Sequence, residues 1–379
     1  MASDNNVGYP AQIAVGLITD GLPEIQTARC GESEGFLVSN LLIGDGFHWQ
    51  QCREAFVPGS LHHLSPPQGN IHVVNMVDIE DYVLSVISSE MNPSAPLEFL
   101  KAHAIISRSW AVRKIMEKGE SEVKGRIHAD GISVDWEESD SHHGFDVCSD
   151  DHCQRYQGFP ARIPEQAREA VESTRGMVLT APDNSVADAR FSKCCGGRTE
   201  RFSSCWADAD MTYLPVKEDS WCDLSDLTET ERVGFLDTCL RNFDRKTEDF
   251  LTWSTTVDKV WLRDNIIARH GVDLGEIISL EALERGGSGR ITRLMIRGRR
   301  GVLTVGKELA IRRLLARDCL RSSWFDAEDC GDHFRITGRG WGHGVGLCQI
   351  GAARMAREGY DFKSILEFYY PGATIRSFG

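Results

Sequence analysis

Short apolar runs separated by turn residues fill the first part of the chain. The segment QIAVGLI, from Gln12 to Ile18, predicts a buried strand, and the Asp20-Gly21 pair after it is typical of a turn. A loop-like stretch from Gly59 to Asn70 leads to another apolar run, IHVVNMV, at Ile71 to Val77. We therefore expect residues 1–70 to form a small β-rich N-terminal segment.

The period of the apolar residues changes to that of a helix after Asp78. An apolar stripe at helical spacing runs towards Glu90, and Met91-Asn92-Pro93 predicts the end of this helix, because the residue before a proline disfavours helical backbone angles. A second helix is expected from about Ser94 to about Gly119. The stripe that leads to Glu90 consists of Ile79, Val83 and Val86.

The rest of the chain alternates between irregular and regular patterns. Residues 119–163 are polar, rich in acidic residues and histidine, and predict an extended loop or insertion. Residues 223–285 look mainly helical, whereas two apolar runs within residues 291–305 resemble a β-hairpin. These elements predict the α+β fold class, with residues 71–379 forming helices and mixed β-sheet around a groove.

The overall charge narrows the classes of partner. The 379 residues carry a formal net charge of -14 at pH 7, with 41% hydrophobic and 26% charged residues. Binding of a polyanion requires clustered cations, so nucleic acid and an anionic membrane surface are disfavoured as main partners. The sequence contains no apolar run of the roughly 18 residues that a transmembrane helix needs. An uncharged or cationic partner fits this charge better.

Cysteine and histidine gather in one part of the polar insertion. This part contains His142, Cys148, His152 and Cys153. The four nitrogen and sulfur ligands fit a closed tetrahedral zinc site of structural type. His143 is an alternative to His142, and a set of surface histidines with unrelated thiols is an alternative to a metal site. A separate group of cysteines predicts buried thiols or disulfides: Cys194, Cys195, Cys205, Cys222 and Cys239.

A carboxylate on an apolar helix face has a chemical use. Surroundings of low dielectric constant favour the neutral form of a carboxyl group and raise its pKa, so Glu90 is a candidate general acid. Glu90 could instead cap the following turn or lie at a solvated end of the helix.

Two basic residues border the apolar stripe of the second predicted helix. Lys101 and Arg108 are separated by about two helical turns, so they point in the same direction. The pair could bind an anionic group or orient Glu90, although long basic side chains beside a core commonly extend to water. Tyr82 could supply a polar hydroxyl or serve only as packing.

A segment near the C-terminus places glycine at every second position. From Gly338 to Gly346 it reads GRGWGHGVG, so an extended backbone would leave one face bare and display Arg339, Trp341 and His343 on the other. Trp341 could stack on a sugar ring while Arg339 and His343 hydrogen-bond to it. Tight internal packing with unusual backbone angles is an equal alternative. The spacing matches neither G-x-G-x-x-G nor a P-loop, which disfavours nucleotide binding.

Other candidate residues have simpler interpretations. Cys348 follows His343 closely enough to suggest a cysteine hydrolase, but a small buried residue at the start of an apolar helix is the simpler interpretation. No spacing separates ligand stacking from core filling for Trp206, Trp253 and Trp261, and core filling is expected for them.

Two separated blocks of sequence resemble one known family. The first, IEDYVLSVISSEMNPSAPLEFLKAHAIISRSWAV, runs from Ile79 to Val112, and the second, GRGWGHGVGLCQIGAARMAREGYDFKSILEFYYPGATI, runs from Gly338 to Ile375. Both are similar to the signatures of stage II sporulation protein D and LytB-type amidase enhancers. The motifs FSKCCGGRTE and YLPVKED lie between them and resemble intermediate motifs of this family.

This resemblance implies a role at the bacterial cell wall. Sporulation members of the family act as lytic transglycosylases on peptidoglycan glycan strands without stem peptides, whereas enhancer members stimulate a partner N-acetylmuramoyl-L-alanine amidase. The catalytic glutamate of the family falls on Glu90, and its functionally important basic residues fall on Lys101 and Arg108.

The resemblance also implies a zinc ion and a carbohydrate-binding cleft. The predicted ligand set resembles the zinc site of clostridial members, which supports Zn²⁺ as a structural cofactor. Tyr213 falls in a Tyr-Leu motif that contributes to the cleft of the family. The candidate substrate-binding residues are therefore Lys101, Arg108, Tyr213, Arg339, Trp341 and His343.

Lytic cleavage requires a simpler acid-base arrangement than hydrolysis. One acid protonates the glycosidic oxygen and then, as the conjugate base, activates the 6-hydroxyl of the same sugar. Retaining or inverting glycosidases need a carboxylate pair, for which only Glu80-Asp81 or Glu98 is available nearby in the sequence. We therefore predict a lytic transglycosylase with a substrate groove. A non-catalytic wall-binding activator of an amidase is the alternative, and a structural zinc protein without wall function is a third hypothesis.

The cellular location follows from the substrate rather than from a targeting segment. Met1–Asn6 is polar and shows no basic segment followed by an apolar core. Because polymerised wall glycan lies outside the cytoplasm, a location in the cell envelope implies export of a longer precursor. Turnover of imported wall fragments is the alternative.

Overall fold

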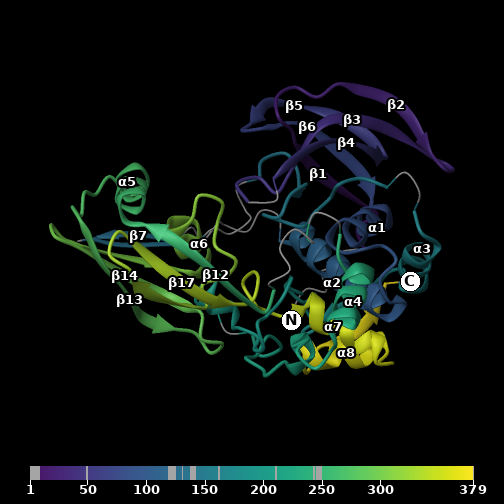
Figure 1. Ribbon diagram of the computed structural model, residues 1–379. Helices are drawn as coiled ribbons and strands as arrows, with labels where there is room; N and C mark the ends of the chain where they lie inside the picture. Colours follow the sequence, from purple (N-terminus) through teal and green to yellow (C-terminus); the bar gives the residue numbers. More distant parts are fainter. Residues whose placement is uncertain are drawn as a thin grey trace, which may run out of the picture.

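The chain forms two lobes, seen at the right and the left of Figure 1. The computed structural model describes residues 9–47, 50–117, 125–129, 131–136, 142–160, 163–209, 211–241, 244 and 250–378. Both lobes combine helices with separate sheets, which confirms the predicted α+β class. None of the described helices has the length and apolar character needed to cross a lipid bilayer.

Strands from the N-terminal part of the chain build two sheets on the larger lobe, which we call the body. One sheet has the order β5-β6-β1-β9, and the other has the order β2-β3-β4. Because β6 pairs with β1, strands from both sides of residue 70 share one sheet, and the predicted division at residue 70 does not separate two structural units. The strands are β1 (Gln12–Ile18), β2 (Ile25–Cys30), β3 (Ser33–Ile43), β4 (Gln51–Pro58), β5 (Ser60–Gln68), β6 (Ile71–Asp78) and β9 (Val147–Cys148).

Two consecutive helices cross the centre of the body. Asp78 accepts a hydrogen bond from Glu80 N and caps the start of α1 (Ile79–Glu90), and the extended Met91 ends it, as predicted. In α2 (Leu97–Met116), residues 102–112 are all buried, so this helix is enclosed on nearly every side rather than along one stripe. The other body helices are α3 (Glu165–Ser173), α4 (Glu229–Cys239), α7 (Gln349–Arg357) and α8 (Phe362–Tyr369).

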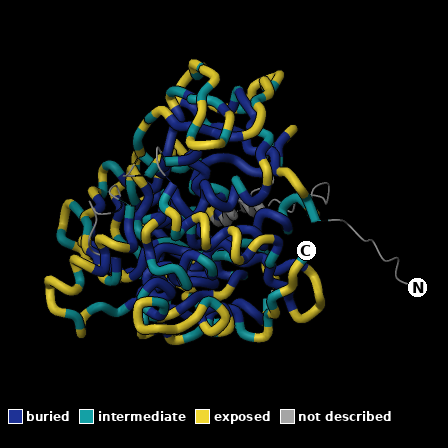
Figure 2. The backbone as a smooth tube through the Cα atoms, turned by 90° about the vertical axis from the view of Figure 1, so that its right-hand side faces the viewer, coloured by how far each residue is buried: buried dark blue, intermediate teal, exposed yellow. Residues whose placement is uncertain are grey.

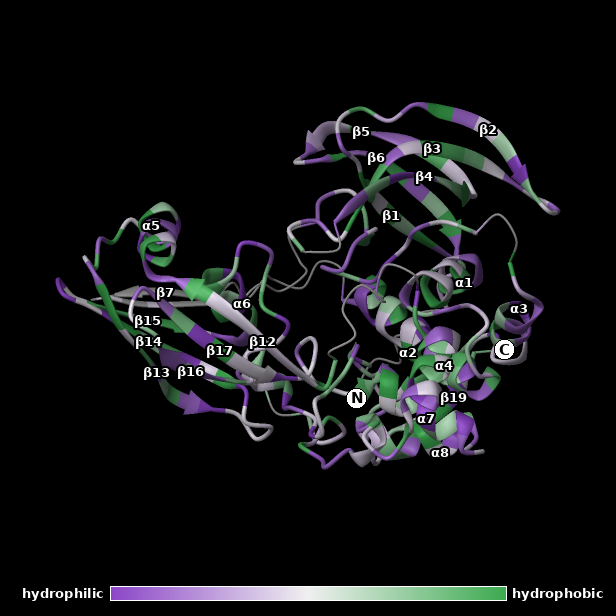
Figure 3. Cartoon of the chain, in the orientation of Figure 1, coloured by the Kyte–Doolittle hydropathy of each residue, from purple (hydrophilic) through white to green (hydrophobic). Residues whose placement is uncertain are grey.

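The smaller lobe has its own hydrophobic core. Two sheets, β13-β14-β15-β8-β7 and β12-β17-β16, enclose apolar side chains that include Trp253, Leu262, Ile296 and Phe334. Figure 2 shows buried and exposed segments alternating along the chain, and Figure 3 shows hydrophilic and hydrophobic segments alternating along the strands. The elements are β7 (Gly125–Ala129), β8 (Ile132–Trp136), β12 (Thr252–Asp258), α5 (Lys259–His270), β13 (Ile277–Arg285), β14 (Ile291–Gly298), β15 (Val302–Gly306), α6 (Glu308–Leu315), β16 (Phe325–Asp329) and β17 (His333–Arg339).

Tertiary pairing overrides two predictions in this lobe. Residues 119–163 contain the hairpin β7–β8, which continues the sheet through β15, although this region lacked a strand pattern. Residues 223–285 contain β12 and β13 beside helices, although a mainly helical region was predicted. The predicted hairpin within residues 291–305 is confirmed as β14–β15.

Short pairings connect distant parts of the body. β11 runs parallel to β18 and thereby brings the FSKCC motif beside the glycine-rich segment. β10 pairs with the C-terminal β19. These elements are β10 (Met177–Thr180), β11 (Phe191–Ser192), β18 (Leu347–Cys348), β19 (Thr374–Ser377) and the 3-10 turns η1 (Phe202–Ser204) and η2 (Ser220–Cys222).

Candidate active site

A cavity of about 290 Å³ lies between the body and the smaller lobe. The body contributes Glu90 at the end of α1, the loop of residues 150–155 and residues 190–193. The smaller lobe contributes the first turns of α6, and residues 341–343 from the glycine-rich segment also line the cavity. The wall therefore combines carboxylates, cations and aromatic rings, which suits a polar ligand with ring faces.

Glu90 is a buried carboxyl group on this wall. It lies at the C-terminal end of α1, and only 7% of its surface is exposed. Its Oε1 accepts a hydrogen bond from Arg155 N at 3.1 Å, and no group among the described residues bonds to Oε2. Burial raises the pKa of Glu90, and the charge of Asp151 adds to the rise, while Arg155 and Lys193 oppose it. The group therefore keeps its proton at a higher pH than an exposed glutamate does.

A buried ion network fixes the backbone around Glu90. Lys193 Nζ donates to the carbonyl oxygen of Glu90 at 2.8 Å and lies 3.1 Å from Asp244 Oδ2. The other oxygen of Asp244 lies 3.3 Å from Arg155, which also pairs with Asp151 at 2.6 Å. Lys193 thus satisfies the last carbonyl of α1. Asp244 therefore links Lys193 to Arg155, whose backbone N–H bonds to the Glu90 carboxyl group.

Sequence reasoning missed these network residues. Lys193 lies inside the FSKCCGGRTE motif, so the motif was the available signal, but nothing in its spacing singled out the lysine. Arg155 and Asp244 carry no local pattern at all. They become recognisable only when the fold brings three distant segments together.

A second part of the wall pairs cations with aromatic rings. The guanidinium of Arg190 lies 4.2 Å from the ring centre of Trp206 and pairs with Asp188 at 2.7 Å. Trp206 in turn meets the ring of His343 edge to face at 4.8 Å. Trp206 was predicted as core filling, but it lines the cavity. The arrangement offers a ring face and a positive charge to the same ligand.

The glycine-rich segment supplies two of its three predicted contact residues. Trp341 and His343 line the cavity, whereas Arg339 is exposed and lies 5.2 Å from the ring of Trp324 outside it. Burial lowers the pKa of His343, and nearby guanidinium groups lower it further, which favours the neutral form of the ring. Its Nδ1 accepts a hydrogen bond from Val345 N at 2.9 Å.

The backbone of this segment is not the extended ribbon that the alternating glycines predicted. Gly340, Gly342, Gly344 and Gly346 all have φ between 72° and 90°. Residues other than glycine rarely adopt this left-handed region. A Cβ atom at Gly344 would lie 2.5 Å from Arg290, so the packing alternative describes the segment correctly.

The structure does not bring Lys101, Arg108 or Tyr213 to the cavity. Arg108 is fully buried beside Glu80, with Nη2 and Oε2 separated by 2.5 Å, because α2 is enclosed on the side where a solvent-facing edge was expected. Lys101 pairs with Glu98 at 2.8 Å. The hydroxyl of Tyr213 accepts a hydrogen bond from Asp188 N. Direct contact of these three residues with a substrate stays a prediction that this geometry does not support.

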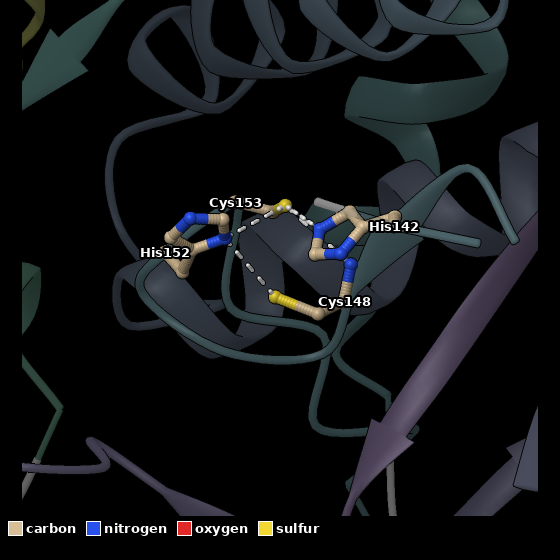
Figure 4. A group of neighbouring side chains, drawn as sticks. All are labelled: His142, Cys148, His152 and Cys153. Atoms are coloured by element: carbon tan, nitrogen blue, oxygen red, sulfur yellow. Dashed lines mark hydrogen bonds between the residues drawn. The ribbon is translucent and has the colours of Figure 1, made fainter. Parts of the chain in front are cut away.

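The four predicted zinc ligands do converge. Figure 4 shows His142, Cys148, His152 and Cys153 pointing towards one another. Cys153 Sγ lies 3.2 Å from His142 Nε2 and 3.7 Å from His152 Nδ1, which lies 3.8 Å from Cys148 Sγ. Tetrahedral zinc with bonds of about 2.0 Å to nitrogen and 2.3 Å to sulfur places its ligands roughly 3.3–3.8 Å apart. The group therefore fits zinc, and His142 rather than His143 belongs to it.

The candidate metal group and Glu90 share one loop. Cys148 belongs to β9, which pairs with the central strand β1. His152 and Cys153 line the cavity, and Arg155 N, which bonds to Glu90, follows two residues later. A metal ion on these ligands would hold the loop between β1 and the carboxyl group. Its role would be structural, because four protein ligands leave no open position.

Other carboxylates also reach the cavity. Asp45, Asp150, Asp151 and Glu308 line it, although only Glu80-Asp81 and Glu98 appeared available from the sequence. Asp151 pairs with Arg155, and Glu308 pairs with Arg312. Asp150 accepts hydrogen bonds from Gly44 N and Asp45 N, and burial raises its pKa to about 7. Most of these carboxylates therefore have structural partners.

The cysteine-hydrolase alternative finds no support. Cys348 is fully buried, and its Sγ accepts hydrogen bonds from Cys195 N at 3.3 Å and Gly351 N at 3.5 Å. Among the residues with described positions, no hydrogen bond joins Cys348 to His343.

Two family models match separate parts of the chain. One described as "Stage II sporulation protein" matches residues 67–180, which include Glu90 and the candidate zinc ligands. A domain of unknown function, DUF8618, matches residues 200–346, which include Trp341 and His343.

Curated relatives are similar over most of the chain. An uncharacterized protein of Brachyspira hyodysenteriae is 27% identical, and the match covers 84% of this chain and 71% of that protein. Stage II sporulation protein D of Bacillus subtilis is 26% identical over 80% of this chain and 75% of its own length. The amidase enhancer of Bacillus subtilis is 25% identical over 77% of this chain, but over only 40% of its own length. The predicted resemblance is confirmed: residues 67–180 match the stage II sporulation protein family model, and most of the chain is similar to stage II sporulation protein D and to the amidase enhancer.

Proposed function

We propose that the chain is a lytic transglycosylase that cleaves peptide-free glycan strands of peptidoglycan. The observation that carries the proposal is Glu90, a buried carboxyl group with a raised pKa on the wall of a cavity. Similarity to a stage II sporulation protein D supports the wall substrate that the sequence motifs imply. Glycan strands outside the cytoplasm would then be the main partner, in the cell envelope.

One carboxyl group can perform both proton transfers of this reaction. The protonated Glu90 donates its proton to the glycosidic oxygen as the bond from that oxygen to the anomeric carbon breaks. The resulting carboxylate then accepts the proton of the 6-hydroxyl of the same sugar, whose oxygen bonds to the anomeric carbon. Glu90 ends protonated, no water is consumed, and the product carries an anhydro end. The raised pKa of Glu90 suits the first step, because it keeps the carboxyl group protonated.

The neighbouring groups have supporting roles in this proposal. Lys193 and Arg155 are positioning residues, because they hold the backbone at the carboxyl group. Trp206, Trp341 and the Arg190 guanidinium offer stacking surfaces and charge for a sugar with an acidic substituent. Zinc on the four Cys and His ligands would supply a structural cross-link of the loop that carries Arg155.

A non-catalytic activator of a cell-wall amidase is the second candidate function. The relative named amidase enhancer supports it, although this chain spans less than half of that protein. In this case the cavity would bind glycan without cleaving it, and Glu90 would not be needed for the stimulation.

Product analysis separates the two functions. Purified glycan strands without stem peptides are incubated with the native protein, with Glu90→Gln and with Glu172→Gln, and the ends are identified by mass spectrometry. Glu172 is an exposed glutamate on α3 that pairs with Arg175, so its substitution is a matched control outside the cavity. Lytic cleavage predicts anhydro ends from the native protein and the control, and none from Glu90→Gln.

The other outcomes also decide between functions. No cleavage by any of the three proteins, together with stimulation of an added amidase by all of them, would establish the activator. Reducing ends in place of anhydro ends would instead indicate hydrolysis, with a second carboxylate of the cavity as the base.

A further inference from the structure

A second cluster of potential metal ligands lies inside the body, away from the loop of the first. Cys195, Asp219, Cys222 and Cys348 are all buried, and one ligand atom from each lies within 4.8 Å of those from the other three. They come from three separate segments: the end of the FSKCC motif, the turn η2, and the residue before α7. The sequence predicted Cys195 and Cys222 as buried thiols or disulfides and Cys348 as a small buried residue.

Two distances within this cluster are close to those between the ligands of a tetrahedral metal ion. Cys195 Sγ lies 3.5 Å from Cys222 Sγ and 3.2 Å from Asp219 Oδ2. An ion with bonds of about 2.3 Å to sulfur and about 2.0–2.2 Å to oxygen holds its four ligands roughly 3.5–3.8 Å from one another, so each of the two distances lies within about 0.3 Å of this range. A disulfide needs a bond of about 2.0 Å between sulfurs and would leave the third thiol and the carboxylate unused.

The surroundings of Asp219 also point to a cation. Its side chain is fully buried, and among the residues with assigned positions no ion pair joins it to a lysine or arginine, although the charge of Lys217 acts on it from a longer distance. A buried carboxylate without a close counter-charge is unfavourable, and such groups are usually paired or bound to metal. Its oxygens accept hydrogen bonds from Trp221 N and the hydroxyl of Tyr369, both at 3.0 Å. Such outer hydrogen bonds orient carboxylates that bind metal ions.

The backbone around the cluster is adapted to thiolates. Cys348 Sγ accepts hydrogen bonds from Cys195 N and from Gly351 N in the first turn of α7. A helix N-terminus and N–H donors stabilise a negatively charged sulfur. Gly351 also leaves room for the carboxylate, because a Cβ atom there would lie 2.9 Å from Asp219 Oδ2.

We propose that Cys195, Asp219, Cys222 and Cys348 form a second, structural zinc site. Binding would release the protons of the three thiols, and four protein ligands would close the coordination shell. The ion would join the segment that carries Lys193 to the start of α7. Because Lys193 bonds to the last carbonyl group of α1, the zinc site would stabilise the segment that holds the end of α1 at the cavity wall. The proposal does not depend on glycan cleavage.

Zinc content of the full-length chain tests this assignment. Native protein purified with zinc, then passed over a mild chelating resin, should contain two zinc ions per chain by mass spectrometry of the metal. Cys222→Ser and Asp219→Asn should each retain one ion, as should a Cys148→Ser/Cys153→Ser variant that lacks the first site. Cys239→Ser is the matched control, because Cys239 is a buried thiol outside the cluster, and it should retain two ions.

X-ray absorption of the Cys148→Ser/Cys153→Ser variant gives the identity of the ligands. Three sulfur neighbours at about 2.3 Å and one oxygen at about 2.0 Å are expected. Four sulfur neighbours would overturn the assignment of Asp219 in favour of Cys194, whose thiol also adjoins Cys222 and Cys348. The Cys148→Ser/Cys153→Ser variant could instead contain no zinc and a Cys195–Cys222 disulfide, which alkylation and peptide mapping without reductant would identify. This result would overturn the metal site itself. Folding of each variant is checked by its circular dichroism.

Discussion

The two ends of α1 each hold a buried glutamate, and the two carboxyl groups differ in their partners. Glu80 in the first turn is 5% exposed and Glu90 at the last position is 7% exposed. Glu80 pairs with the fully buried guanidinium of Arg108 and accepts further hydrogen bonds from Tyr9 and Gly176 N. Glu90 receives one backbone hydrogen bond and faces a cavity.

This comparison shows that burial alone does not make a carboxyl group a candidate proton donor. The guanidinium of Arg108 makes bidentate hydrogen bonds to Glu80, so Glu80 serves as one half of a structural ion pair. At Glu90, burial is the largest influence on the pKa, and the nearby Arg155 and Lys193 only oppose it. The partners of a buried carboxyl group therefore distinguish a proton donor from a structural anion.

The largest expected effect is loss of cleavage on substitution of Glu90. Glu90→Gln preserves the shape of the side chain but removes the transferable proton, so the rate of glycan cleavage should fall by about 10²–10⁴-fold. Glu80→Gln, tested at a temperature where the variant is folded, should retain a rate within a few-fold of native. Cleavage rates are measured from anhydro ends over time. Equal losses in the two variants would contradict the division of roles.

The two variants should show the reverse order in loss of stability, with Glu80→Gln more affected than Glu90→Gln. Glu80→Gln leaves Arg108 buried without its counter-charge, so the free energy of unfolding should fall by about 3–5 kcal/mol. Urea unfolding followed by circular dichroism measures this difference.

Because the pKa of Glu90 is raised by folding, its protonated form stabilises the native state, and this contribution is lost as the pH rises through the raised pKa. Relative to Glu90→Gln, native protein should therefore lose stability with rising pH.

Removal of the candidate metal group of His142, Cys148, His152 and Cys153 should have an intermediate effect on the rate of cleavage. In Cys148→Ser/Cys153→Ser the loop that presents Arg155 N to Glu90 loses its cross-link, so cleavage should fall by about 10–100-fold. The matched change Cys30→Ser, at a cysteine outside both clusters, should retain the native rate and metal content. A native rate in the double variant, with zinc lost, would show that the loop keeps its position without metal.

The smallest expected effect is on the pH profile. Cleavage should decline as the pH rises through the pKa of Glu90, because the acid must be protonated. The positive charge of Lys193 lowers that pKa, so Lys193→Met should move the decline upward by up to about one pH unit. The pH dependence of kcat/KM measures this shift. A decline that stays in place would show that Lys193 acts only on the backbone.

Local periodicity was sufficient to predict the position of Glu90. The apolar stripe on α1 and the proline after it predicted both the helix and the buried carboxyl group at its end. The convergence of the four candidate metal ligands was also predictable, because all four lie in one short segment whose composition differs from its surroundings.

Features set by tertiary contacts could not be predicted in the same way. Arg108 was placed at a groove edge, since the sequence does not reveal that α2 is enclosed on nearly all sides. The partners Lys193 and Asp244 are far from Glu90 in sequence and follow no period. In the glycine-rich segment, alternation is compatible with both an extended and a left-handed backbone, and only the contacts with Arg290 and neighbouring segments select the second.

Digestion of peptide-free glycan strands in ¹⁸O-labelled water tests the role of Glu90 most directly. If Glu90 hands its proton to the glycosidic oxygen and then recovers one from the 6-hydroxyl, native protein should give anhydro ends that contain no ¹⁸O, and Glu90→Gln should give none. Reducing ends labelled with ¹⁸O, or the same anhydro products from Glu90→Gln, would contradict the account.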